Sequence, residues 1–382
     1  MKALGMMSGT SLDGIDAALV DIAPAGTGYA LALLSFVTIP YETPLSERLR
    51  SVLPPHSGSI ALAAELARDL GEAYARAAVA AVGETAVDYV AMHGQTLFHD
   101  GTRGITLQSG LPYALRDAIR ATVCFDFRSA DCALGGHGAP LMPYVDALLL
   151  RSATEDVVAV NLGGIANLTF LPRGAALRDV IAYDTGPGNM LIDSFVFART
   201  QGSAAFDEGG RTALAGNVDA AALQEMLSDP YFAMLPPKST GRERFGAQFL
   251  QAHREVLDRL SLEDGAATLS ALTAETVARA VRGAASPGAR VVVSGGGAHN
   301  RAVVDSLKER LAGYGVEETG IMQLPGDAKE AMGFAVLGYE TLRERPANLP
   351  QVTGARGPAV LGAIAPYRLA ELLARVRSEC TA

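Results

Sequence analysis

The sequence predicts a mixed α/β protein built from two lobes. Its 382 residues exceed what one ordinary core accommodates and suit two domains of about 150 to 200 residues. Two stretches, one at the start and one after residue 150, each open with short apolar strands joined by glycine-containing turns and continue into helical patterns. We expect one lobe to comprise residues 1–130 with a C-terminal segment of about 350–382, and the other to comprise residues 131–349.

The strands and helices of the first lobe follow from local patterns. Apolar and β-branched runs separated by glycine-containing turns predict strands. These strands are expected at residues 2–7, 15–22, 30–39, 87–92 and 121–125. Leu62, Leu66, Leu70 and Tyr74 recur at four-residue spacing, which places one apolar stripe on a helix over residues 59–82. A further helix is expected over residues 111–120.

The second lobe is expected to repeat the strand-turn-strand opening of the first. Residues 128–143 carry three glycines and two prolines, which predicts the crossing between the lobes there. Strands are expected at residues 157–161, 166–171, 179–183 and 290–293. Helices are expected at residues 220–228, 245–260, 268–284, 301–312 and 329–344, with a last helix at 365–377.

Composition and charge exclude several classes of protein. The formal charge of −9 opposes broad nucleic-acid binding, which needs clustered Lys and Arg. The three cysteines form no CxxC pair, so neither a disulfide framework nor a structural zinc site is indicated. Charges interrupt the apolar runs well before the roughly 20 residues of a membrane span. Only five apolar or small residues separate Lys2 from Ser8, too few for a secretory signal, so we expect a cytoplasmic protein.

The first candidate site is a loop between two predicted strands. Its small residues let backbone N–H groups approach phosphate oxygens, and the hydroxyl groups of Ser8, Thr10 and Ser11 add donors. A polar hairpin turn is the alternative, but the density of hydroxyl groups, glycines and carboxylates exceeds what a turn needs. The candidate residues of this loop are Gly9, Thr10, Ser11, Leu12, Asp13, Gly14, Ile15 and Asp16.

Two glycine-rich segments of the second lobe form a second candidate site. Gly186-Pro187-Gly188-Asn189 precedes a helix, whose N–H groups and dipole would attract an anion. The alternative is that Asp184 or Thr185 merely caps that helix. The candidate residues are Asn161, Gly163, Gly164, Gly186, Gly188 and Asn189.

A third glycine-rich segment follows the apolar strand at 290–293. Gly295, Gly296 and Gly297 would permit close approach of a flat ring or a ribose, although they do not form the dinucleotide motif. Alone, the segment also fits a flexible strand-to-helix loop.

Two polar loops are candidates for a second substrate. One contains His93-Gly94-Gln95-Thr96, and the other, Lys238 to Glu243, follows Pro236-Pro237. A metal site at His93 and His99 is disfavoured, because their separation places them on opposite helix faces and no cysteine assists. Sugar contacts and ordinary solvated polarity remain open.

Together these motifs resemble the anhydro-N-acetylmuramic acid kinases, bacterial enzymes of cell-wall recycling. The resemblance spans most of the chain, in order, and a series of motifs is more specific than any one member. Its segments are Met7 to Asp16, His93 to Thr96, Asp126 to Arg128, Gly135 to Leu141, Asn161 to Asn167, Asp184 to Asn189, Lys238 to Glu243 and Ser294 to Gly297.

The resemblance implies a two-lobed actin/hexokinase-like (ribonuclease H-like) fold with mixed sheets and an interlobe cleft. It implies a phosphotransferase that uses ATP and Mg²⁺ to convert 1,6-anhydro-N-acetylmuramic acid and water to N-acetylmuramic acid 6-phosphate. Water would cleave the anhydro bond while O6 is phosphorylated. A homodimer that binds neither nucleic acid nor membrane is expected.

The resemblance also implies residue roles. The three glycine-rich segments would bind ATP, with 294–297 near the adenosine, and Asp184 would be the general base. Candidates for the sugar pocket are Gln95, Thr96, Lys238, Ser239 and Glu330. Ser8 stands where many related kinases have Asp, so either Asp13 or Asp184, directly or through water, would hold Mg²⁺.

Two alternatives remain at this point. One is another sugar or carboxylate kinase of the same fold, and the other is a non-enzymatic actin-like ATP-binding module. The two polar loops disfavour the module, because a nucleotide sensor needs no second small-molecule pocket.

Overall fold

The protein divides into two compact units. The computed structural model describes residues 1–9, 12, 14–26, 28–53, 56–317 and 328–379. Unit 1 comprises Met1–Leu149 and Ala328–Ala382, and unit 2 comprises Leu150–Asp327.

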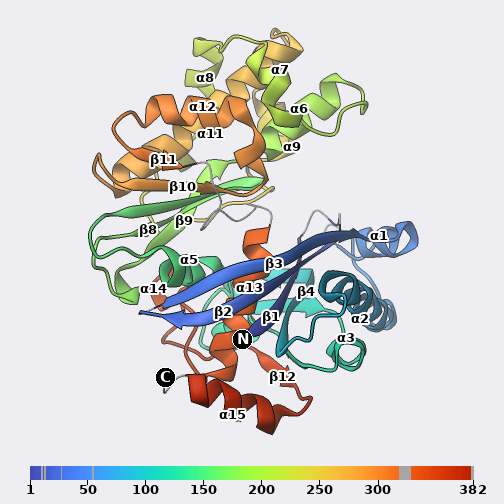
Figure 1. Ribbon diagram of the computed structural model, residues 1–382. Helices are drawn as coiled ribbons and strands as arrows, with labels where there is room; N and C mark the ends of the chain where they lie inside the picture. Colours follow the sequence, from blue (N-terminus) through green and yellow to red (C-terminus); the bar gives the residue numbers. More distant parts are fainter. Residues whose placement is uncertain (10–11, 13, 27, 54–55, 318–327, 380–382) are drawn as a thin grey trace. The chain divides into compact units, whose positions relative to one another are not determined.

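Unit 1 is built on a seven-stranded mixed sheet. Its strand order is β12-β6-β4-β1-β2-β3, and β5 pairs with β4 (Figure 1). The strands are β1 (Lys2–Ser8), β2 (Gly14–Ala25), β3 (Gly28–Pro40), β4 (Tyr89–Asp100), β5 (Ile105–Ser109), β6 (Thr122–Phe125) and β12 (Ala363–Ala365). The helices are α1 (Thr43–Arg50), α2 (Ile60–Val82), α3 (Pro112–Ile119), α4 (Ser129–Ala133), α5 (Met142–Leu150), α13 (Lys329–Leu342), α14 (Pro350–Thr353) and α15 (Leu369–Glu379).

Unit 2 is built on a five-stranded mixed sheet of order β11-β10-β7-β8-β9. In Figure 1 its helices gather on one side of this sheet. The strands are β7 (Val157–Leu162), β8 (Ile165–Leu171), β9 (Ile181–Pro187), β10 (Arg290–Ser294) and β11 (Gly315–Glu317). The helices are α6 (Met190–Arg199), α7 (Arg211–Leu214), α8 (Ala220–Met226), α9 (Ala247–Ala252), α10 (Arg254–Leu257), α11 (Leu262–Ala284) and α12 (Arg301–Arg310).

The two sheets share one topology. In unit 1, β2 is antiparallel to β1 and β3, whereas β4 runs parallel to β1 and β6 parallel to β4. In unit 2, β8, β7, β10 and β11 repeat these relations with β9 at the edge. This is the strand order of the ribonuclease H-like fold, so the predicted mixed α/β class and the echo between the two halves are confirmed.

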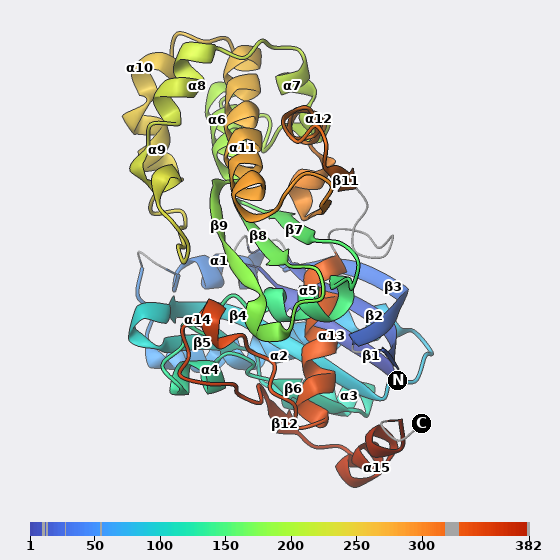
Figure 2. The same ribbon diagram turned by 90° about the vertical axis from the view of Figure 1, so that its left-hand side faces the viewer.

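Helices cover both faces of the unit 1 sheet because side chains alternate along β1. Leu4 and Met6 belong to one buried cluster with Leu66 and Leu70 of α2. Gly5 points to the opposite face, where a Cβ atom would lie 1.8 Å from the carbonyl oxygen of Ala331. Glycine is therefore needed where α13 lies along the sheet (Figure 2).

The units divide at 149/150 and 327/328, whereas the sequence predicted divisions at 130/131 and about 350. Residues 128–143 lie within unit 1 and are not the crossing. The physical reason is packing: α5 and α13 both belong to unit 1, and the Lys329 Nζ lies 2.9 Å from the Asp146 Oδ1 in a buried ion pair. In the described residues no helix is long and apolar enough to cross a membrane.

Candidate active site

Three glycine-rich segments of unit 2, distant in sequence, lie together at one end of its strands. Ser294 at the end of β10 lies beside Asn161 of β7. A Cβ atom at Gly295 would lie 2.5 Å from the Asn161 Oδ1, and one at Gly297 would lie 2.9 Å from the Asn189 Oδ1. The structure therefore brings together the predicted residues of the β7–β8 turn, the start of α6 and the segment after β10.

Glycine is required in these segments because backbones approach closely. A Cβ atom at Gly188 would lie 2.1 Å from the carbonyl oxygen of Gly163. Gly186 has a φ of +148°, and its Cβ atom would lie 2.7 Å from the Phe232 ring. Gly296 differs, because no heavy atom lies within 4 Å of its would-be Cβ. Gly296 is therefore the glycine of its segment that faces open space.

Two N–H groups predicted to be free before α6 are occupied. The N–H of Gly188 donates to the Gly164 carbonyl oxygen and that of Asn189 to the Gly163 carbonyl oxygen, each at 2.9 Å. These bonds close the β7–β8 turn onto the helix, so an anion would have to use other donors. Gly164 itself is exposed, and among the described residues its N–H has no backbone acceptor.

The helix α6 begins after Asn189, which occupies the N-cap position without a side-chain capping bond. Thr185 donates its hydroxyl to the Ala166 carbonyl oxygen. The alternative interpretation, a cap by Asp184 or Thr185, is therefore wrong. The Asn189 Oδ1 is buried without a hydrogen-bond partner. A buried acceptor without a protein donor is available to a ligand or a water molecule.

Asp184 lies within β9 and is held on three sides. Its Oδ2 accepts a hydrogen bond from the Thr240 N–H at 2.9 Å. Its carbonyl oxygen accepts from the Tyr231 hydroxyl at 2.7 Å, and its N–H donates to the Lys238 carbonyl oxygen at 3.3 Å. The carboxylate is therefore fixed by the loop that carries the predicted sugar-binding residues.

The environment of Asp184 suits a general base. Burial raises the pKa of Asp184 to about 6, the Thr240 N–H opposes the rise, and the charge of Glu243 adds to it. A carboxylate with a pKa near 6 is ionised at pH 7 yet holds a proton better than an ordinary aspartate. The hydrogen bond from Thr240 goes to Oδ2. Among the described residues none donates to Oδ1, which is therefore available to a ligand.

Lys238 is a restrained cation beside Asp184. Its Nζ donates to the Tyr231 carbonyl oxygen at 3.1 Å and lies 4.6 Å from the centre of the Tyr231 ring. Burial lowers the pKa of Lys238. Ser239 is exposed, and the buried Thr240 Oγ1 lacks a partner.

The first glycine-rich loop, in unit 1, is described only in part. Thr10, Ser11 and Asp13 lie outside the described residues. Ser8 is not a free donor, because its Oγ bonds to the Tyr74 hydroxyl at 2.6 Å and the Gly94 carbonyl oxygen at 3.2 Å.

The described neighbours in that loop have structural surroundings. The side chains of Leu12 and Ile15 are buried in the unit 1 core, so only their backbones could serve a ligand. Gly14 lies against β3, where its Cβ would be 2.4 Å from the Ile39 carbonyl oxygen. The Asp16 Oδ1 accepts from the Thr38 hydroxyl at 2.6 Å.

Gln95 is hydrogen-bonded to the start of this loop. Its side chain is fully buried, its Nε2 donates to the Gly9 carbonyl oxygen at 3.1 Å, and its Oε1 accepts from the Tyr41 hydroxyl at 3.0 Å. Both ends of the amide are thus occupied. The hydroxyl oxygen of Thr96 accepts from the Gln108 Nε2 at 3.2 Å.

Glu330 lies at the start of α13, and no hydrogen bond or ion pair joins its side chain to another residue that the structure describes. Burial raises the pKa of Glu330, the charges of Arg128 and Lys329 lower it, and that of Asp16 raises it. The carboxylate of Glu330, the guanidinium group of Arg128 and the carboxylate of Asp16 therefore lie near one another in unit 1.

Comparisons with known proteins decide the family. A sequence model described as anhydro-N-acetylmuramic acid kinase matches residues 1–367. The chain belongs to the anhydro-N-acetylmuramic acid kinase family. A relative with this name from Streptomyces coelicolor is 41% identical, over 96% of this chain and 94% of the relative. Another from Synechococcus elongatus is 42% identical, over 95% of this chain and 98% of the relative.

Solved structures similar to this family member are more distant in sequence. A ROK family glucokinase from Streptomyces griseus, in complex with glucose and AMPPNP, is 14% identical with a TM-score of 0.37, covering 88% of this chain and 99% of that chain. A ROK hexokinase from Thermus thermophilus is 17% identical with a TM-score of 0.33, covering 88% and 98%.

The described residues offer few protein ligands for a magnesium ion. Among the described residues no three His, Cys, Asp or Glu side chains form a metal cluster. Mg²⁺ needs only one or two carboxylates when phosphates and water complete its shell. Asp184 meets that requirement, and the other candidate, Asp13, lies outside the described residues.

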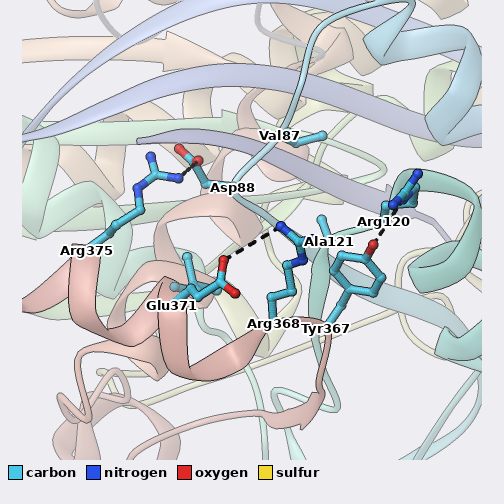
Figure 3. A pocket seen from close by; sticks show the side chains of 9 residues that line it. Val87, Asp88, Arg120, Ala121, Tyr367, Arg368, Glu371 and Arg375 are labelled. Atoms are coloured by element: carbon cyan, nitrogen blue, oxygen red, sulfur yellow. Dashed lines mark hydrogen bonds and ion pairs between the residues drawn. The ribbon is translucent and has the colours of Figure 1, made fainter.

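A separate pocket in unit 1 does not belong to this family member's candidate site. Its volume is about 300 Å³, and it lies between the start of β6 and α15 (Figure 3). Four of its charged groups form two ion pairs, Arg375 with Asp88 at 2.6 Å and Arg368 with Glu371 at 3.7 Å, and Arg120 donates to the Tyr367 hydroxyl. These side chains are therefore engaged within the protein.

Two residues that contact or surround candidate site residues were not predicted from the sequence. Tyr231, which bonds to Asp184 and restrains Lys238, follows a proline in a short 3₁₀ turn with no distinguishing pattern. Arg128 lies in a family-like motif, but its surroundings depend on residues brought together by folding.

Proposed function

We propose that this family member is an ATP-dependent kinase that converts 1,6-anhydro-N-acetylmuramic acid and water to N-acetylmuramic acid 6-phosphate in cell-wall (murein) recycling. Relatives that bear this kinase's name match nearly the full chain. The observation that carries the chemistry is Asp184, a fixed carboxylate whose burial raises its pKa to about 6.

Asp184 acts as the general base for water. It takes a proton from the water molecule, the water oxygen forms a bond to C1 of the anhydrosugar, and the bond between C1 and O6 breaks. The electron pair left on O6 attacks the γ-phosphorus of ATP, whose bond to the ADP oxygen breaks. A positioned base of this kind contributes about 10² to 10⁴ in rate.

The glycine-rich segments of unit 2 bind ATP. Exposed backbone at Gly164 supplies N–H groups for phosphate oxygens. Gly296 leaves room for the adenosine, and the unpartnered Asn189 Oδ1 accepts a hydrogen bond from it. The loop from Gly9 to Asp16, held by Gln95, completes the phosphate contacts.

The sugar contacts come from both polar loops and from α13. Lys238 and Ser239 belong to the loop that fixes Asp184, and the Glu330 carboxylate has no hydrogen bond to the described residues. Thr96 lies beside Gln108 on the adjacent strand. Hydroxyl-rich ligands suit such donors and acceptors, because each unmet buried polar group is costly.

The proposal also includes Mg²⁺, a homodimer and a cytoplasmic location. Mg²⁺ would be held by ATP phosphates with Asp184 or Asp13, directly or through water, and would neutralise phosphate charge. Chelation should abolish turnover, and added Mg²⁺ should restore it. Light scattering coupled to gel filtration tests the dimer, and a monomer at micromolar concentration would refute it.

Oxygen labelling tests the reaction itself. In ¹⁸O-water with a rapid quench, the label should appear at C1 of the product and not in the transferred phosphate. Unlabelled C1 would mean that water is not the nucleophile there. Parallel assays with N-acetylmuramic acid and with no acceptor separate this reaction from an ordinary sugar kinase and from an ATP-binding module.

A further inference from the structure

Arg128 is a partly buried cation of unit 1 whose hydrogen bonds, among the described residues, go to neutral acceptors. Its Nε donates to the His93 Nε2 at 3.0 Å, and its Nη1 donates to the Gly138 carbonyl oxygen at 2.8 Å. Both acceptors are neutral atoms. Within the described chain no carboxylate forms an ion pair with this guanidinium group, and its hydrogen bonds are made by Nε and Nη1, not by Nη2.

The surroundings of Arg128 fix its orientation. His93 is 2% exposed, and its ring centre lies 4.7 Å from that of Phe334. Burial, with the charge of Arg128, holds the pKa of His93 well below its usual range, so the imidazole accepts the Arg128 bond as a neutral ring.

The second anchor of Arg128 is equally restrained. The N–H of Gly138 donates to the Oδ2 of Asp131 at 2.8 Å. Asp131 is fully buried, and its Oδ1 accepts from the Asn348 Nδ2 and the Thr353 hydroxyl, each at 2.7 Å. This network holds the loop whose carbonyl oxygen receives the Arg128 bond.

A restrained guanidinium group without a hydrogen-bonded carboxylate is suited to an anionic ligand. Burial lowers the pKa of Arg128, and the charge of Glu330 opposes this change only in part. The carboxylate of Glu330 is near enough to act on Arg128 electrostatically, but no ion pair joins the two in the part of the chain that the structure describes. The planar fork of Arg suits a carboxylate, which it can bind through two parallel hydrogen bonds.

We propose that Arg128 binds the lactyl carboxylate of the sugar and thereby selects the muramic acid form over sugars that lack this group. This inference rests on the proposed function, which supplies the substrate. The phosphates of ATP are the other anions of the reaction, but backbone donors of the glycine-rich segments are available to them. Arg128 shares its neighbourhood with Glu330, a candidate sugar contact.

Sugar discrimination by Arg128 variants tests the proposal. The two ligands are 1,6-anhydro-N-acetylmuramic acid and 1,6-anhydro-N-acetylglucosamine, which has no lactyl group. Calorimetry with an ATP analogue gives the Kd of each sugar, and kcat/KM gives turnover. Arg128→Gln should weaken binding of the acidic sugar by about 10- to 100-fold, the range for a hydrogen-bonded charge pair. Binding of the neutral sugar should change by less than about threefold.

Controls separate recognition from folding. Arg128→Lys keeps the charge but loses the fork, so it should restore part of the preference. Arg116→Gln removes an arginine of α3 that pairs with Asp117, and it should leave both sugars unaffected.

Each other outcome overturns the inference. Equal loss for both sugars would mean that Arg128 has only a structural role, and weaker ATP binding without sugar would mean that it contacts phosphate. A wild-type protein without preference for the acidic sugar would also overturn it. If the wild-type protein binds the acidic sugar through Arg128 but does not phosphorylate it, the proposed function fails and this inference stands.

Discussion

Replacing Asp184 by Asn should slow the reaction and stabilise the ligand-free protein at the same time. The slowing follows from loss of the base and amounts to about 10² to 10⁴ in kcat, with binding of both substrates retained. The stabilisation follows from burial, because an amide keeps the bond from the Thr240 N–H without carrying a desolvated charge.

The magnitude follows from the pKa of Asp184. The rise from 3.8 to about 6 means that the folded protein binds this proton more tightly than the unfolded chain does. The ionised carboxylate therefore costs little stability at pH 4. The cost grows as the pH rises from 3.8 through 6, and it reaches about 1 to 3 kcal/mol at pH 8. Asp184→Asn should gain this amount at pH 8.

Two measurements check the reasoning. Denaturant midpoints of the ligand-free wild type and variant are compared between pH 4 and pH 8, so that other titrating groups cancel. The wild-type kcat should fall about tenfold for each pH unit below 6, and the residual rate of the variant should not follow that profile. Asp258→Asn is the matched control, because Asp258 is exposed and pairs with Arg254.

A difference in midpoint that does not change with pH would refute the buried charge. Loss of substrate binding in Asp184→Asn, with unchanged kcat at saturation, would refute the base.

Three further substitutions test other parts of the structure. Gly296→Ala should leave thermal stability unchanged and weaken ATP binding, because only a ligand would occupy the space beside it. Gly297→Ala should lower stability, since its Cβ atom would lie less than 3.0 Å from protein atoms. Calorimetry measures the ATP affinity, and thermal unfolding measures the stability. Lys329→Met should cost about 3 to 5 kcal/mol of stability by removing the cation that pairs with buried Asp146. Replacing both residues with apolar ones should recover much of this loss, and an equally damaged double variant would argue against the ion pair. Gln95→Ala should raise the KM for ATP more than that for the sugar, because its amide holds the first loop, and a larger change for the sugar in steady-state kinetics would instead make Gln95 a sugar contact.

The folding pattern was predictable where local signals were strong. The apolar stripe from Leu62 to Tyr74 predicted a helix over 59–82, and α2 spans Ile60–Val82. Strands at 30–39 and 157–161 correspond to β3 and β7. Boundaries were less predictable: the helix expected over 245–260 is divided into α9 and α10, and β9 continues through Asp184 to Pro187.

Hydrogen-bond partners of the candidate site were not predictable in the same way. The glycines of 186–189 suggested free N–H groups, but Gly188 and Asn189 donate to carbonyl oxygens of a turn more than 20 residues earlier. Ser8 suggested a phosphate donor, but Tyr74 and Gly94 occupy its hydroxyl. A motif records residue type and spacing, whereas partners depend on which strands become neighbours.

The class of fold and the family could be predicted from the sequence, because strand and helix periodicity and glycine-rich turns are local properties of the chain. The state of individual groups depends on how the chain folds. Burial raises the pKa of Asp184 to about 6, and folding brings His93 and Gly138 to Arg128. Desolvation and long-range contacts arise when distant segments pack together, so no local pattern could have specified them.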